Sequence, residues 1–137
     1  MAEDMEQAME RVREGYEAFN RGDFDAAAKW IHPEIVWQRV ADVETEIEGR
    51  EAVRENMDPN VFEQQHTDVL AIEVIGESVL VDSVFRATGA GSGIELDQAG
   101  YNLWKIRDGM AAAFQFFLDR DEAVRVAREQ EGLEQSG

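Results

Sequence analysis

The chain has 137 residues, of which 44% are hydrophobic and 31% charged, a composition that excludes a disordered chain and fits one globular domain. A formal net charge of −17 disfavours nucleic acid and anionic membrane surfaces as partners, and the absence of cysteine excludes disulfides and thiolate metal sites. The acidic N-terminal stretch lacks the apolar segment of a signal peptide, so we expect a cytoplasmic protein.

The N-terminal part predicts two helices separated by a turn. Apolar residues recur there at helical spacing, namely Met5, Met9, Val12, Tyr16 and Phe19, followed by Phe24, Ala27, Ala28 and Ile31. Between the two sets, Gly22 can take the left-handed position after the first helix, and Asp23 can cap the second.

The remainder predicts mainly strands. We expect a strand over 34–40, an acidic loop over 41–48, a helix over 49–57, strands over 63–75, 78–88, 94–107 and 110–118, and a C-terminal helix. Asp108-Gly109 is a strong hairpin signal, and Asp119 with Glu122 resembles a capping box. The order indicates one α+β domain over residues 1–137, with a curved antiparallel sheet and the N-terminal helices packed on its concave face.

Three segments carry a resemblance to a known family. They are YEAFNRGDFDAAAKWIHPEIVW, IEGREAVRENM and YNLWKIRDGMAAAFQFFLDRDEA. In them the chain resembles the nuclear transport factor 2-like (NTF2-like, cystatin-like) superfamily, in particular its SnoaL-like branch. That superfamily also holds ketosteroid isomerase, limonene epoxide hydrolase and the polyketide cyclases. The resemblance implies a cone-shaped α+β barrel, a pocket between the sheet and the first helices, and frequent dimerisation through the outer sheet face.

The resemblance carries over little of the ketosteroid isomerase chemistry. The position of the isomerase's aspartate base holds Gln38, and that of its oxyanion-side acid holds Asn102. Its helix-one tyrosine falls at or beside Gly15, with Tyr16 one position away. Asn102 and Tyr16 can donate hydrogen bonds, but the proton shuttle is missing.

The catalytic residues of the other family activities are not clearly matched in this chain either. The epoxide hydrolase places an arginine and two aspartates where this chain has Ser83, Phe85 and Phe116. For a polyketide cyclase acid, Asp97 and Asp82 are the nearest candidates, and strand parity puts Asp82 on the wrong face.

Alternation along the strands predicts an apolar pocket with neutral polar groups. Its expected lining is Val36, Gln38, Val81, Ser83, Phe85, Asn102, Trp104, Phe114, Phe116 and Leu118. Such a lining suits a small, mostly apolar, uncharged ligand, although the same aromatic residues could instead fill the core.

If the chain is an enzyme, His66 is the first choice for a base. Asp68 lies two residues on and could orient the imidazole ring, while Asn102 and Tyr16 would stabilise negative charge on a substrate oxygen. The competing interpretation is a histidine near the end of a strand, close to solvent. We expect no cofactor and no metal, because no further histidine or carboxylate cluster supports one.

Three further motifs have ordinary structural explanations. The His32-Pro33-Glu34 run lacks the cysteines of a zinc deaminase, and the glycine-rich segment 89–93 has neither the lysine nor the helix of a phosphate loop. The alternating Glu44, Glu46 and Glu48 fit a solvated edge better than a calcium site.

Two classes of function remain at this stage. The first is a non-catalytic binding or dimerisation module for a small neutral ligand, which the lost carboxylates favour. The second is an isomerase- or polyketide-cyclase-like enzyme that moves a proton on a small hydrophobic carbonyl compound. We also expect a homodimer through the outer sheet face, where strand alternation places Ala111, Ala113, Gln115 and Phe117 on a flat patch.

Overall fold

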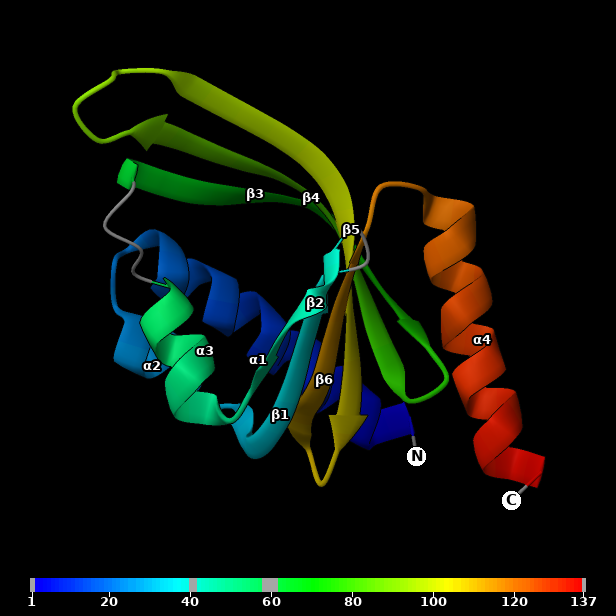
Figure 1. The fold of residues 1–137 in the computed structure, drawn as a ribbon. Coiled ribbons are helices and arrows are strands. Elements are labelled where there is room, and N and C mark those ends of the chain that lie inside the picture. Colours follow the sequence, from blue (N-terminus) through cyan, green and yellow to red (C-terminus); the bar gives the residue numbers. More distant parts are fainter. Residues whose placement is uncertain (1, 40–41, 58–61, 137) are drawn as a thin grey trace.

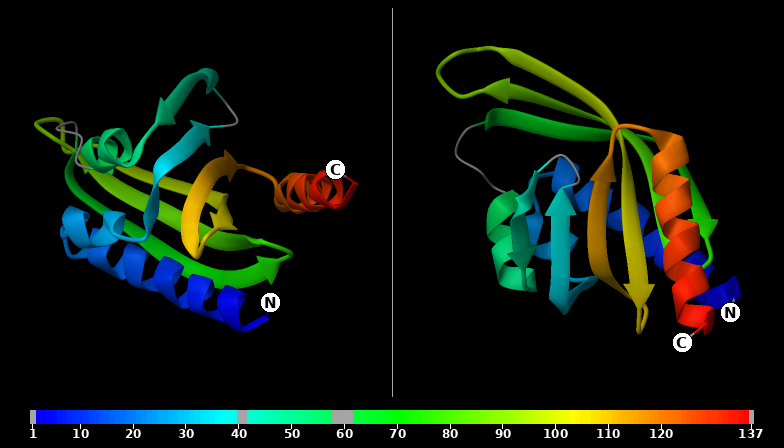
Figure 2. Two further views of the ribbon diagram at one scale, coloured as in Figure 1. Left: turned by 90° about the horizontal axis from the view of Figure 1, so that it is seen from below. Right: turned by 45° about the vertical axis from the view of Figure 1, so that its right-hand side comes forward.

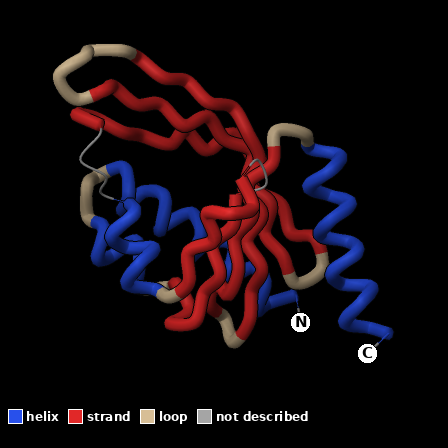
Figure 3. Tube along the Cα trace, viewed as in Figure 1, coloured by secondary structure: helices blue, strands red, loops and turns tan. Residues whose placement is uncertain are grey.

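The structure is a computed structural model that describes residues 2–39, 42–57 and 62–136. Its elements in chain order are α1 (Ala2–Asn20), α2 (Phe24–Ala28), β1 (Ile31–Arg39), β2 (Asp42–Glu48), α3 (Arg50–Met57), β3 (Phe62–Ile75), β4 (Ser78–Gly89), β5 (Glu95–Arg107), β6 (Met110–Phe117) and α4 (Arg120–Ser136). The predicted helices and long strands are confirmed to within a few residues at each end. The expected acidic loop over 41–48 was wrong, because the part of it that the structure describes forms strand β2 (Figures 1 and 3).

The six strands form one curved sheet in the order β2-β1-β6-β5-β4-β3. Every neighbouring pair is antiparallel except β1 and β6, which run parallel. The parallel pair arises because β6 returns to lie beside β1 after the chain has built β3, β4 and β5. The predicted α+β architecture is therefore confirmed, with one parallel contact added to the expected antiparallel sheet.

Two hydrophobic clusters lie on opposite faces of the sheet. On the concave face, α1 and α3 pack onto the strands, and Val12, Ile35 and Val53 are completely or almost completely buried there. On the outer face, α4 covers part of the sheet, where Phe117 packs against Ala123. Figure 2 shows α1 and α4 on opposite sides of the sheet.

The turn between α1 and α2 has the geometry that its sequence predicts. Gly22 adopts φ +81°, and its N–H donates to the carbonyl of Phe19, while the N–H of Asp23 donates to the carbonyl of Ala18. These two bonds form a Schellman motif, which satisfies the last carbonyls of α1. The carboxylate of Asp23 then accepts from the N–H of Ala26 at 3.2 Å and caps α2.

The end of α1 also attaches to the exposed edge of β3. The Asn20 amide nitrogen donates to the carbonyl oxygen of Thr67 at 2.9 Å, and the Thr67 N–H donates to the Asn20 amide oxygen at 2.8 Å. The side-chain amide thus pairs with β3 as the backbone of another strand would. This contact holds α1 against the concave face at one point of the sheet's open edge.

Candidate functional site

The candidate site is built on the concave face of β4, β5 and β6. Strand pairing places Val81 beside Asn102, and Asn102 beside Phe116. In the next row, Ser83 pairs with Gly100. Since paired residues point to the same side of a sheet, one polar group from each of β4 and β5 faces the helices.

A chain of hydrogen bonds joins these groups to α1. The Asn102 amide nitrogen donates to the Tyr16 hydroxyl oxygen at 2.7 Å and to the Ser83 hydroxyl at 3.1 Å. The Trp104 indole N–H donates to the same Tyr16 oxygen at 3.0 Å. Tyr16 therefore accepts two hydrogen bonds, and its own proton is left to donate.

The electrostatics of this polar cluster, defined as Tyr16, Ser83, Asn102 and Trp104, are those of neutral groups. Burial raises the pKa of the Tyr16 phenol well above its ordinary value of 10.0, and the hydrogen bonds from Trp104 and Asn102 oppose that shift only in part. The phenol therefore stays protonated across the physiological pH range. No other member of the cluster ionises in that range.

Aromatic rings surround one side of the polar cluster. The Trp104 ring contacts Trp30, with centroids 5.0 Å apart, Trp37 at 5.6 Å and Phe114 at 4.5 Å. Trp37 in turn stacks on Phe114, with centroids 4.0 Å apart and planes inclined by 27°. These four residues are called the aromatic wall below.

Phe116 borders the polar cluster on another side. A side chain on Gly100 would overlap the Phe116 ring, so the ring lies directly over that glycine. Gly15 has a comparable role on α1, because a Cβ there would come within 2.5 Å of the Trp30 indole nitrogen. The two glycines allow aromatic rings to approach the backbone next to the site.

The structure brings together most of the side chains that the sequence placed on the concave face. Two pairs of neighbouring residues on β5 and β6 lie there, namely Asn102 with Phe116 and Trp104 with Phe114. Strand alternation adds three β4 positions, namely Val81, Ser83 and Phe85.

Three residues of the expected lining are not found on the concave face. Val36 and Leu118 were placed wrongly, and the side chain of Gln38 lies outside the described part of the structure. Val36 pairs with Ala113, in the row one step away from Trp37 and Phe114, so it does not share their face. The Gln38 backbone pairs with Gln115, and its side chain is outside the described part of the structure. Leu118 follows the end of β6 and is 66% exposed.

The sequence interpretation missed Trp37 and Trp30. Ile35 and Trp37 alternate as a large apolar pair, which could have revealed the concave register of β1. Val36 between them is equally apolar, and the register shift between Ile31 and Val36 made the parity of β1 harder to infer.

His66 and Asp68 do not join the polar cluster, which corrects the expected group of four catalytic residues. They flank the buried Thr67 on β3, so both point to the outer face of the sheet. His66 Nε2 lies 2.8 Å from an Asp68 carboxylate oxygen, and Arg86 Nε donates to the other oxygen at 2.6 Å. Arg86 also lies 3.2 Å from Asp97, which completes an exposed ladder of charges.

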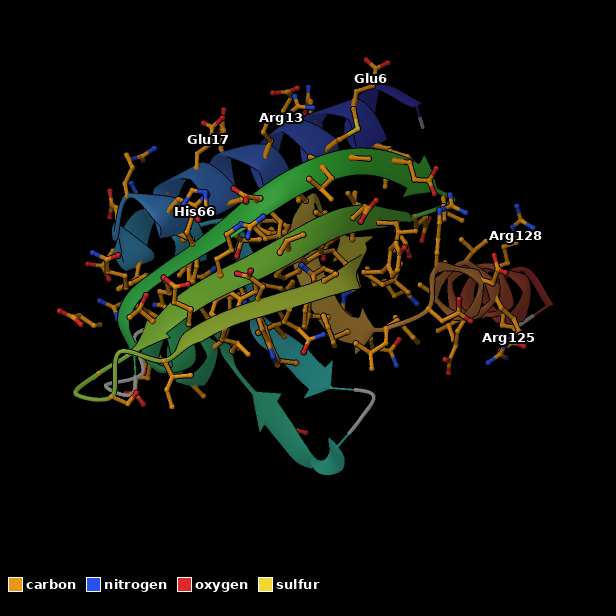
Figure 4. All side chains as sticks on the ribbon, turned by 90° about the horizontal axis from the view of Figure 1, so that it is seen from above. Glu6, Arg13, Glu17, His66, Arg125 and Arg128 are labelled. Carbon is orange, nitrogen blue, oxygen red and sulfur yellow. The ribbon has the colours of Figure 1, made fainter. Side chains whose placement is uncertain are left out.

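The ladder changes the pKa of its central carboxyl group. The hydrogen bond from Arg86 is the largest cause and holds the pKa of Asp68 below its ordinary value, with a smaller contribution from His66. The imidazole of His66 is half exposed on the outer face, on the other side of the sheet from Tyr16 and Asn102. Figure 4 labels His66 on β3.

The surface that motivated a homodimer also needs correction. Ala111 is fully buried in the hydrophobic cluster on the concave face, because a register shift between Lys105 and Ile106 changes the parity of β6. Phe117 is only 2% exposed, since α4 covers it. A dimer through the outer face would therefore have to use the part of the sheet that α4 leaves open.

Within the described residues, no group of three histidine, aspartate or glutamate side chains is arranged to hold a metal ion. The helices of that same part of the chain include none with the length and apolarity to span a membrane. A surface hollow lies along α4 and is lined by Asp121, Val124, Arg125, Arg128 and Glu129. It belongs to the outer side of the molecule, as the labelled arginines in Figure 4 show, and has no connection with the polar cluster.

Solved structures define the class of fold. An NTF2-like protein of unknown function from Burkholderia pseudomallei is 22% identical, with a TM-score of 0.72 over 88% of this chain and 97% of that chain. A proposed SnoaL-like polyketide cyclase from Jannaschia sp. CCS1 is 20% identical, with a TM-score of 0.71 over 88% and 90%. TerC, crystallised with polyporic acid, is 16% identical, with a TM-score of 0.70 over 89% and 98%. At these identities the likeness concerns the fold.

The sequence itself assigns the family. Residues 12–114 match the SnoaL-like domain, so the chain belongs to the SnoaL-like family. Among proteins with curated descriptions, none matches the sequence.

Proposed function

We propose that this protein binds a small, neutral, largely apolar ligand on its concave face and does not catalyse proton transfer. Tyr16 would donate its hydroxyl proton to an acceptor oxygen of the ligand, while the aromatic wall would contact the ligand's apolar part. The observation that carries the proposal is the neutrality of the polar cluster, whose only ionisable group is a phenol kept protonated by burial.

Physical chemistry favours a neutral ligand at such a site. An ion that leaves water for this environment would lose its hydration without gaining a partner of opposite charge, which is costly. A neutral carbonyl or hydroxyl compound loses far less and regains a hydrogen bond from Tyr16. The neighbouring structure determined with polyporic acid makes a small organic ligand a reasonable choice for a first test.

The test compares three probes of similar size by calorimetry, namely 1-tetralone, naphthalene and 1-naphthoate. We expect 1-tetralone to bind most tightly, and Tyr16→Phe to weaken its binding by about tenfold. Tyr101→Phe is the matched control, because Tyr101 pairs with Phe117 on the outer face and packs against the cluster under α4. Tighter binding of 1-naphthoate, or equal effects of the two tyrosine variants, would refute the proposal.

A second measurement tests whether the protein is an enzyme instead. Two of its structural neighbours are described as proposed polyketide cyclases, and they suggest this alternative. Proton transfer next to a carbonyl would exchange the C2 hydrogens of 1-tetralone with deuterium in D₂O, which NMR follows directly. We expect no acceleration by the protein, because no base is present in the polar cluster. Exchange that the protein accelerates and Tyr16→Phe abolishes would establish catalysis instead.

A further inference from the structure

One polar atom on the concave side has no partner. The indole N–H of Trp37 is buried, and it makes no hydrogen bond within the part of the chain that the structure describes. Buried donors in native proteins are almost always paired, since an unpaired one loses its hydration without compensation. This N–H therefore needs an explanation beyond packing, because a phenyl ring would stack on Phe114 without the cost.

The described side chains that contact Trp37 offer this N–H no acceptor. Phe114 has no polar atom, and the indole N–H of Trp104 is itself a donor that the Tyr16 oxygen already accepts. That oxygen also accepts from Asn102, so both of its lone pairs are occupied. Among the described residues, the N–H of Trp37 and the O–H of Tyr16 are thus donors on the concave side that have no side-chain acceptor.

We propose that Trp37 is a second recognition residue, whose indole N–H donates to a second acceptor oxygen of the ligand. This inference rests on the proposed function and narrows its ligand class to flat, neutral compounds with two separated carbonyl-type oxygens. One oxygen would accept from Tyr16 and the other from Trp37, with the flat apolar part lying along the aromatic wall. Trp37 and Tyr16 both make T-shaped contacts with the ring of Trp104, with centroids 5.6 and 6.2 Å away, so both donors belong to residues that contact the same ring.

The experiment compares a compound with two carbonyl groups, 2,3-dimethyl-1,4-naphthoquinone, with 1-tetralone, which has one. We expect Trp37→Phe to weaken binding of the dicarbonyl compound by about five- to tenfold and to change binding of 1-tetralone by less than twofold. Trp30→Phe is the matched control, because it makes the same chemical change in another ring that contacts Trp104. It should affect both compounds equally.

A second readout uses the unmodified protein and does not depend on the folding of a variant. The chain has 3 tryptophans, so its ¹H–¹⁵N spectrum contains few indole signals to assign. The Trp37 signal should move downfield when the dicarbonyl compound is added and should stay in place with 1-tetralone. An unmoved signal, or an equal loss of affinity for both compounds in Trp37→Phe, would overturn this inference and leave the proposed function intact. Failure of the wild-type protein to bind either compound would overturn both.

Discussion

The contact between Asn20 and the edge of β3 gives a stability prediction of defined size. Asn20→Ala removes both hydrogen bonds to Thr67 and leaves the backbone N–H and carbonyl of this buried residue without those partners. Each bond contributes about 1 kcal/mol net, and an unpaired buried group adds to the loss, so we expect about 2–3 kcal/mol of destabilisation. Alanine's better helix propensity offsets only about 0.5 kcal/mol of this. For a domain of this size the melting temperature should fall by roughly 6–12 °C.

Urea unfolding followed by tryptophan fluorescence measures this change, with the slope m expected to stay constant. Asn20→Asp separates the two bonds, because a carboxylate can accept from the Thr67 N–H but cannot donate to its carbonyl. Gln98→Ala is the control, since the Gln98 amide makes an exposed, local bond to the carbonyl of Ala99. A loss below 0.5 kcal/mol in Asn20→Ala, of the order expected for ordinary surface substitutions, would refute the reasoning.

Three further predictions test other parts of the structure. Gly100→Ala should destabilise the fold by about 1–3 kcal/mol, because the new methyl group overlaps the Phe116 ring; equal stability of the variant in urea would contradict that packing. Arg86→Gln should be less stable than the wild type near neutral pH, with the difference disappearing in acid. The ion pair that lowers the pKa of Asp68 stabilises the fold at pH values above 3.8, the ordinary pKa of this group. This stabilisation is lost as the pH falls through the lowered pKa of the folded state, so a difference that persists in acid would exclude this cause. Sedimentation at micromolar concentration should give a homodimer, and a monomeric mass would remove the expectation of self-association.

The parts of the fold that the sequence predicted are those with strong local signals. Gly22 and Asp23 define their turn through backbone freedom and a side-chain cap, and both act within a few residues. The long hairpins of β3 to β6 follow in the same way from alternation and turn residues. The acidic segment over 42–48 was missed because glutamates are poor strand formers, and their alternation is equally typical of an exposed loop.

The candidate site was harder to predict because it depends on strand parity. A slip of one residue in β1 exchanged Val36 for Trp37, and it thereby hid the unpaired indole N–H. His66 and Asp68 were correctly predicted to share a face, but only the pairing with Arg86 identifies that face as the outer one. Long-range pairing decides such questions, and a single sequence does not contain it.

The two faces of β3, β4 and β5 differ in charge, and this difference leads to a last prediction. The outer face carries the ladder of His66, Asp68, Arg86 and Asp97, while the polar cluster on the concave face is neutral. A carboxylate ligand is therefore opposed twice, by the net charge of −17 at long range and by loss of hydration at the site. Salt separates the two effects. At 1 M it limits the long-range charge repulsion to about 3 Å, and it barely affects the loss of hydration at the site.

We expect the preference for 1-tetralone over 1-naphthoate to shrink between low salt and 1 M salt but to remain clear in both, as calorimetry can show. A preference that vanishes at 1 M would mean that the overall charge alone causes it. A preference that is unchanged by salt would mean that the acidic surface has no part in it. The intermediate result follows only if a neutral site lies within an acidic protein.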